Sequence, residues 1–200
     1  MFTFFAFVGP AAAAVTISFY AHKLGNKGFW IEFPHAYVTL NGTTEIGHLP
    51  VKANFGFTPP VVGPSVLWGK VDGVVVGAED SYVAQDTPYF SFPLTDRQYA
   101  AVLAVVARWR DAPQPSYDLD THNCVIFVKE VAAAVGLSVG GDNAYVRRPA
   151  EFLADLQTRN AALLARLTTG GRTIATASVP QPASASPGAK QSPALSIISP

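Results

Sequence analysis

The chain keeps its strand-forming and helix-forming segments apart. Five short segments near the N-terminus alternate β-branched or aromatic residues with small or polar ones, which is typical of strands. They cover residues 15–22, 33–42, 51–59, 73–80 and 88–94. Apolar residues in the second half recur three and four positions apart, which indicates helices. Strands followed by helices predict an α+β fold, in which an antiparallel sheet of about five strands carries the helices on one face.

Turn and cap residues fix several boundaries of these elements. Asn41-Gly42 closes the second strand and is typical of a tight hairpin turn. Thr95 and Gln98 have the spacing of a capping box, so a helix should begin there. The predicted helices span residues 95–110, 122–137 and 149–167.

The two ends of the chain differ from the expected domain at residues 15–167. Residues 1–14, "MFTFFAFVGPAAAA", are apolar and end in small residues, as do secretory signals before cleavage. We therefore expect a periplasmic or secreted protein, with a cytoplasmic one as the alternative. The run is too short for a stable membrane span. Residues 168–200 are rich in Ser, Ala and Pro, which predicts a disordered tail.

Composition excludes several classes of partner. The 14 basic and 14 acidic residues balance, and no basic stripe is present, so we expect no nucleic-acid partner. The single cysteine excludes an internal disulfide and a multi-cysteine metal site. We expect no cofactor and no metal, and the sequence does not determine the oligomeric state.

The single cysteine, Cys124, has two interpretations. It shares an apolar helical stripe with Phe127 and Val131, where a cysteine packs as a small hydrophobic residue. It also lies in the first turn of the predicted helix, where free N–H groups and the helix dipole stabilise a thiolate. The second interpretation requires an imidazole close by in space.

Of the four histidines, His35 is the best placed to act as a base. It opens a predicted strand on the same polar face as Tyr37 and Thr39, which could border a cleft. The alternative is an ordinary surface histidine at the strand edge. His122 lies only two residues before Cys124, so its side chain points elsewhere on the helix.

Two short motifs resemble those of a known group of proteins. "NCVIFV" resembles the cysteine element of lecithin:retinol acyltransferase-like proteins, and "HAYVTLNG" resembles their histidine strand. This group is permuted papain-like and related to NlpC-type cell-wall peptidases. The resemblance covers roughly residues 30–137 and implies a permuted papain-like fold, with Cys124 as nucleophile and His35 as general base. Val125-Ile126 stands where the acyltransferase-like members carry Glu-His.

The resemblance also points to supporting residues. A third catalytic group would lie after the histidine strand, where His48 is the first choice and Asn54 and Glu45 are competitors. Tyr117 resembles a tyrosine that helps to hold the oxyanion in the cell-wall peptidases, with loop packing as the alternative. We assign Tyr117, Asn123 and Asn54 to contacts with the oxyanion or the substrate.

Three functions follow from these alternatives. The first is a cysteine-dependent hydrolase of an amide or peptide bond, with cell-wall fragments as the expected substrate. The second is an acyltransferase, or a lipid or thioester hydrolase, that uses the same dyad. The third is a non-catalytic domain in which Cys124 is buried and His35 is structural.

Overall fold

The computed structural model describes residues 14–22, 25–27, 30–32, 34–61, 63–114 and 116–173. Its strands are β1 Val15–His22, β2 Gly25–Lys27, β3 Trp30–Glu32, β4 His35–Thr43, β5 Pro50–Thr58, β6 Val74–Val76 and β7 Phe90–Leu94. Its helices are η1 Pro64–Leu67, α1 Asp80–Val83, α2 Asp96–Arg110, α3 Cys124–Ala134, α4 Pro149–Arg159 and α5 Ala161–Thr173. The predicted signal-like residues 1–13 lie outside the described residues.

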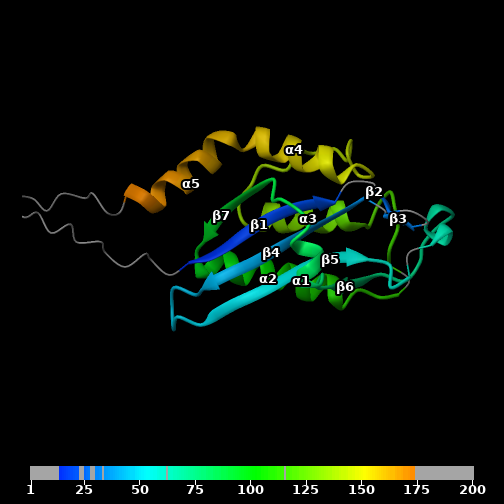
Figure 1. The fold of residues 1–200 in the computed structure, drawn as a ribbon, viewed down its shortest axis with the longest axis horizontal. Coiled ribbons are helices and arrows are strands. Elements are labelled where there is room, and N and C mark those ends of the chain that lie inside the picture. The colour runs from blue at the N-terminus through cyan, green and yellow to red at the C-terminus, as the bar shows by residue number, and fades with distance from the viewer. Residues whose placement is uncertain are drawn as a thin grey trace, which may run out of the picture.

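The main sheet is antiparallel and has five strands in the order β6-β5-β4-β1-β7 (Figure 1). The predicted α+β class and five-stranded sheet are therefore confirmed. A second, two-stranded sheet pairs β2 with β3. Neither of these two strands was predicted from the sequence, because strands of three residues carry no recognisable periodicity.

One face of the sheet forms the core. Along β1, Val15, Ile17 and Phe19 are buried, while the residues between them are partly exposed. In Figure 1, α2 and α3 lie behind the sheet, and their buried side chains include Trp109 and Phe127. The alternation along β1 thus reflects a strand with only one face covered by the core.

The predicted N-terminus of α2 is confirmed by its hydrogen bonds. The Gln98 N–H donates to the Thr95 hydroxyl at 3.3 Å, and the Thr95 N–H donates to the Gln98 side chain at 3.0 Å. These reciprocal bonds are the capping box that the sequence predicted. They hold the start of α2 directly after β7.

The predicted third helix is two helices. The apolar stripe continues through residues 149–167, but α4 ends at Arg159 and α5 begins at Ala161. Asn160 lies between them and bonds through its side chain to both backbone groups of Ser138, at 2.8 and 2.9 Å. α5 then extends to Thr173, into the segment predicted to be a tail; residues 174–200 lie outside the described part.

The two ends of β4 face different surroundings. His35 begins the strand beside the end of β1, whereas Thr43 leads into the β4–β5 turn at residues 44–49. That turn lies at the lower left of Figure 1, and η1 and the small sheet lie at the opposite end. Within the described residues, no helix is long and apolar enough to cross a membrane.

Candidate active site

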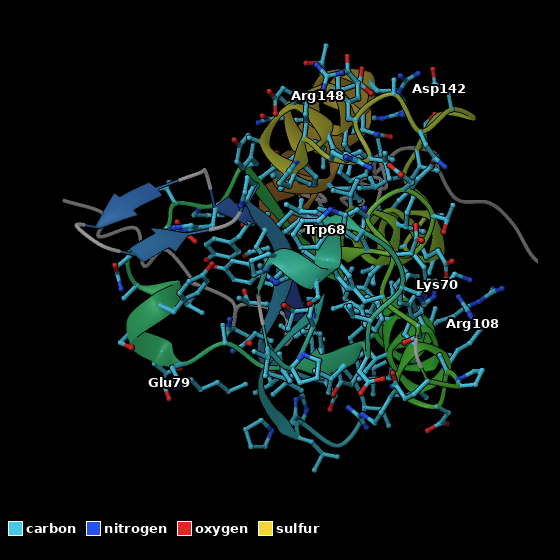
Figure 2. All side chains as sticks on the ribbon, turned by 90° about the vertical axis from the view of Figure 1, so that its right-hand side faces the viewer. Trp68, Lys70, Glu79, Arg108, Asp142 and Arg148 are labelled. Carbon is cyan, nitrogen blue, oxygen red and sulfur yellow. The ribbon has the colours of Figure 1, made fainter. Side chains whose placement is uncertain are left out.

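A cavity of about 800 Å³ opens at the His35 end of the sheet, between the strands and the start of α3. Figure 2 looks onto this end of the molecule, with η1 and the exposed Trp68 in front. Side chains from the strands, the loop before α3 and α3 itself line the cavity, among them His35, Tyr37, Tyr117, Asn123 and Cys124. The structure therefore brings the predicted nucleophile and the predicted base into one cavity.

Cys124 is the first residue of α3, and its side chain is buried, with 4% of the residue exposed. Burial raises the pKa of the thiol to about 11. The backbone N–H groups of Ala36, Val125 and Cys124 itself, and the Tyr117 hydroxyl, act against this increase. Cys124 is therefore a neutral thiol at pH 7, because burial outweighs these donors.

His35 is partly buried, and its imidazole packs against β5. A Cβ atom added to Gly56 would lie 2.6 Å from Nε2 of His35, so the missing side chain at Gly56 makes room for the ring. Burial lowers the pKa of His35 to about 4; His22 adds to this decrease, and Asp86 opposes it. His35 is therefore a neutral imidazole at pH 7.

The ring nitrogens of His35 have no hydrogen-bond partner among the described residues. No buried side-chain nitrogen or oxygen there lacks a partner, so both ring nitrogens are accessible from the cavity. The thiol of Cys124 does not bond to the ring either. It lies instead against the N–H group of Ala36, the residue that follows His35.

A partly buried carboxylate, that of Asp86, lies near His35. Asp86 accepts a hydrogen bond from the Tyr37 hydroxyl at 3.0 Å, and its carboxylate lies 3.1 Å from Nδ1 of His22. His22 pairs with His35 in the β1–β4 register, and the Tyr37 ring is stacked with that of His35 at 6.2 Å. Asp86 was not identified from the sequence, because its partners are 49 and 64 positions away.

Tyr117 packs in the core and also contacts the side chain of Cys124. Its ring packs in the core against Phe57 at 5.6 Å, and only 7% of the residue is exposed. Its hydroxyl interacts with Cys124, and burial raises the pKa of that hydroxyl above the usual value. Tyr117 therefore stays protonated and keeps a donor beside the sulfur.

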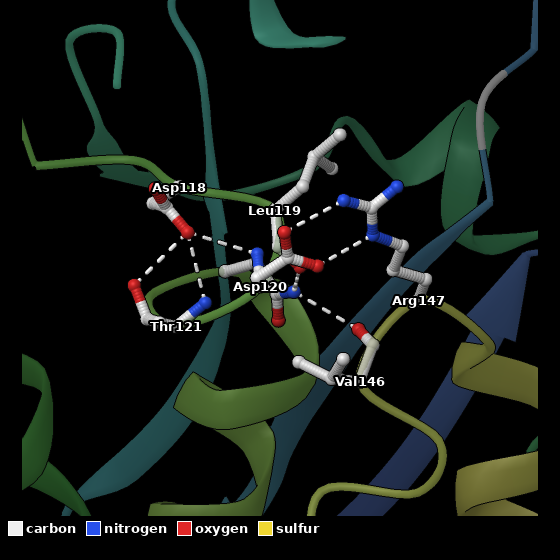
Figure 3. Close-up of polar contacts among 7 residues, drawn as sticks. Asp118, Leu119, Asp120, Thr121, Val146 and Arg147 are labelled. Carbon is white, nitrogen blue, oxygen red and sulfur yellow. Dashed lines mark hydrogen bonds and ion pairs between the residues drawn. The ribbon is translucent and has the colours of Figure 1, made fainter. Parts of the chain in front are cut away.

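Asn123 caps α3, and its amide has no group left for a substrate. Its Oδ1 accepts from the N–H groups of Val125 and Ile126 at 2.8 and 3.1 Å. Its Nδ2 donates to the carbonyls of Leu119 and Val146, whose positions are shown in Figure 3, at 2.6 and 2.9 Å. The predicted substrate contact is therefore replaced by a capping role that holds Cys124 at the helix start.

The structure does not bring His48 or Glu45 to the cavity. His48 is exposed in the β4–β5 turn with φ of 48°, at the far end of β4 from His35. The Glu45 carboxylate accepts from the N–H of Asp96 at 3.2 Å, next to the start of α2. Neither residue is positioned to orient the His35 imidazole, so both are corrected as candidates for the third catalytic group.

Asn54 and His122 also have structural partners. The Asn54 amide bonds to both backbone groups of Ala78, with the Nδ2 donation at 2.9 Å, so the predicted catalytic or substrate role is replaced by support of that loop. The His122 ring is stacked on Trp109 with ring centres 3.8 Å apart, and its Nδ1 lies 2.6 Å from the Ser116 carbonyl. Both side chains hold loops that border the cavity.

The described residues contain no cluster of three His, Cys, Asp or Glu side chains that could hold a metal ion. No protein-family model, curated protein or solved structure matches the chain.

Proposed function

We propose that this protein is a cysteine-dependent hydrolase of an amide or peptide bond and that its domain is permuted papain-like. One observation carries the proposal: Cys124 and His35 line the same cavity, and the thiol lies against the N–H of the residue after His35. The start of α3 and the start of β4 both border this cavity, so a candidate nucleophile and a candidate base share one space.

The first half of the reaction forms an acyl-enzyme. Sγ of Cys124 attacks the carbonyl carbon of the substrate while a ring nitrogen of His35 takes the thiol proton. The tetrahedral intermediate then collapses, the C–N bond breaks, and the imidazolium returns the proton to the leaving amine. The acyl group remains on Cys124 as a thioester.

The second half releases the acid. His35 takes a proton from a water molecule, which attacks the thioester carbonyl, and the C–S bond breaks. The sulfur recovers the proton from His35, so the free enzyme is regenerated. In both halves the Tyr117 hydroxyl is the donor for the oxyanion, because it stays protonated beside the sulfur.

The protonation state of the pair favours general-base catalysis over a resting ion pair. With a thiol pKa of about 11 and an imidazole pKa of about 4, both groups are neutral at pH 7. Proton transfer then accompanies the attack on the carbonyl rather than preceding substrate binding. Asp86 adds negative charge near the ring and stabilises the imidazolium that forms.

The test is turnover of a panel of peptide amides and cell-wall peptide fragments. Cys124→Ala should abolish turnover. Trp68→Ala, which changes an exposed side chain in front of the cavity, should still hydrolyse the substrates. The proposal fails if the Cys124→Ala variant hydrolyses these substrates at the wild-type rate. The cell-wall substrate and the periplasmic or secreted location are part of the proposal and rest on the resemblance and on residues 1–14.

A second function, cleavage or transfer of an apolar acyl group by the same dyad, has its own support. Much of the cavity lining is apolar, including Val66, Leu67, Val76, Leu119 and Val146. Such a lining favours an acyl chain over a polar peptide. A series of thioesters of increasing chain length separates the two: rising kcat/KM with chain length favours the acyl function.

The non-catalytic alternative is supported by the burial of Cys124. It predicts that iodoacetamide does not label the protein at any pH at which the protein remains folded. A cavity thiol with a pKa of about 11 should instead be labelled increasingly as the pH rises toward that value. Mass spectrometry of the alkylated protein over a pH series distinguishes these outcomes.

A further inference from the structure

A second cavity adjoins the one that contains Cys124. It has a volume of about 670 Å³ and shares three lining residues with the first, Pro34, Arg147 and Pro149. The two spaces therefore meet at Arg147. A substrate whose reacting carbonyl lies at Cys124 can extend past Arg147 into the second cavity.

The charged residues of this second cavity are mostly basic. Arg147 and Arg148 both line it, and Glu151 is the one acidic residue among its described lining residues. His22, whose Nδ1 lies 3.1 Å from the Asp86 carboxylate, also lines it. Two arginine side chains that line one space favour a negatively charged ligand.

Arg147 retains donors for such a ligand. Its Nε and one terminal nitrogen donate to the two carboxylate oxygens of Asp120 at 2.6 and 2.7 Å, and Figure 3 shows the other terminal nitrogen turned away from Asp120. Both side chains of this ion pair are more than half exposed, so solvent screens the pair and it contributes little to the stability of the fold. Arg147 can therefore bind a ligand with little loss of fold stability.

Arg148 is anchored without using all of its donors. One terminal nitrogen donates to the Ala144 carbonyl at 2.8 Å, and the guanidinium lies over the Tyr145 ring at 5.0 Å from its centre. A guanidinium has five N–H groups, so others are left to bind a ligand. The contact with Tyr145 restricts the motion of the guanidinium, which reduces the entropy lost on binding.

We propose that Arg147 and Arg148 form a subsite for a carboxylate group of the substrate, located beyond the bond that Cys124 attacks. This inference rests on the proposed function for its reacting centre. Asp120 and Glu151 offset part of the arginine charge, so the subsite matches a singly charged carboxylate better than a dianionic phosphate. The substrate class is therefore an acyl compound with a carboxylate a short chain away.

The test compares three aryl esters of equal chain length, which end in a methyl, a carboxylate or a phosphonate group. For wild-type protein, kcat/KM should be about tenfold higher for the carboxylate ester than for the methyl ester. A factor of this size is expected from one additional hydrogen bond to a charged group. Arg147→Gln and Arg148→Gln should each reduce this ratio, because each removes one of the charges that distinguish the carboxylate ester from the methyl ester.

Arg108→Gln is the matched control. Arg108 also forms an exposed ion pair, with Glu130, but it lies on another part of the molecule than Arg148 (Figure 2), so the preference should persist. An unchanged ratio in both arginine variants overturns the subsite, and a preference for the phosphonate overturns the carboxylate assignment. If Cys124→Ala hydrolyses the esters at the wild-type rate, the proposed function fails instead.

Calorimetric titration tests the subsite without turnover. The probes are two amides of equal chain length, one ending in a carboxylate and one in a methyl group. The carboxylate-ended amide should bind wild-type protein more tightly than the methyl-ended amide. The ratio of the two dissociation constants should be smaller in Arg147→Gln. Equal binding of the two amides to wild-type protein overturns the inference.

Discussion

The two ends of strand β4 carry the same kinds of residue but use them differently. At one end, His35 faces a cavity, its pKa is lowered by burial, and its ring nitrogens have no hydrogen-bond partner among the described residues. At the other, His48 is exposed in a turn whose polar groups bond to nearby backbone atoms. A histidine in this hairpin is therefore a candidate for catalysis because of where the strand places it.

The turn end uses its polar groups for folding. Asp96, the first residue of α2, accepts from the N–H groups of Glu45 and Ile46, both at 2.8 Å. The Thr44 hydroxyl donates to the Ile46 carbonyl at 2.7 Å and accepts from the Leu49 N–H at 3.0 Å. These bonds tie the β4–β5 turn to the helix that follows β7, which stabilises the sheet far from the cavity.

The largest expected difference between the two ends is in catalysis. His35→Asn should lower kcat/KM by about 1,000-fold, because it removes the group that takes the thiol proton. His48→Asn should leave kcat/KM unchanged, since asparagine tolerates the positive φ of this exposed position. Equal losses in both variants, measured with the same amide substrate, would contradict the comparison.

The next difference is in stability at acid pH. The folded protein holds the pKa of His35 at about 4, while the unfolded chain has the usual value of 6.5. Between these values only the unfolded state binds the proton. The free energy of unfolding therefore falls as the pH is lowered, by about 1.4 kcal/mol per pH unit and at most about 3 kcal/mol in total.

Urea denaturation between pH 7 and pH 4 measures this effect. His35→Asn should lose less stability over that range than the wild type, because it lacks the titrating ring. His48→Asn should follow the wild-type curve. A wild-type slope in the His35 variant would show that His35 is not held neutral by the fold.

Two glycines allow activity and stability to be separated. At the cavity end, Gly56→Ala places a Cβ 2.6 Å from Nε2 of His35, so the ring must move, and kcat/KM should fall by about tenfold or more. At the turn end, Gly42 has φ of +133°, and its added Cβ would meet the Ala14 carbonyl oxygen at 2.2 Å. Gly42→Ala should therefore lower the free energy of unfolding by about 2 kcal/mol without a specific loss of activity.

Gly63→Ala is the control for both measurements, because a Cβ there would meet nothing within 4 Å. It should change neither kcat/KM nor stability appreciably. If Gly56→Ala retains full activity, the His35 ring is not held in its productive position by the close packing at Gly56.

The fold class was predictable because periodicity and caps are local. The alternation in β1, the five-stranded sheet and the Thr95–Gln98 capping box could all be identified from residues a few positions apart. The break at Asn160 could not, since the apolar stripe runs through it and the deciding bonds go to Ser138, 22 positions away. The two-stranded sheet was missed because its strands are too short.

Residues of the candidate site were predictable only where a recognisable motif lies at the start of a helix or strand. Cys124 and His35 each begin an element, but only the resemblance of their two motifs paired them. Asn123 was misassigned because the sequence does not show that both sides of its amide are used by backbone groups. The arginine-lined cavity depends on packing between β1 and the start of α4, which no local pattern encodes.

The smallest expected effect concerns Glu45, which the sequence offered as a third catalytic group. Glu45→Ala removes the carboxylate that accepts from the Asp96 N–H, at an exposed position. Because such bonds at a helix N-terminus are partly replaced by water, the free energy of unfolding should fall by only about 0.5–1 kcal/mol. The value of kcat/KM should be unchanged when measured well below the unfolding temperature. A catalytic loss comparable to that of His35→Asn would mean that the turn end takes part in the reaction, and the contrast between the two ends of β4 would then be wrong.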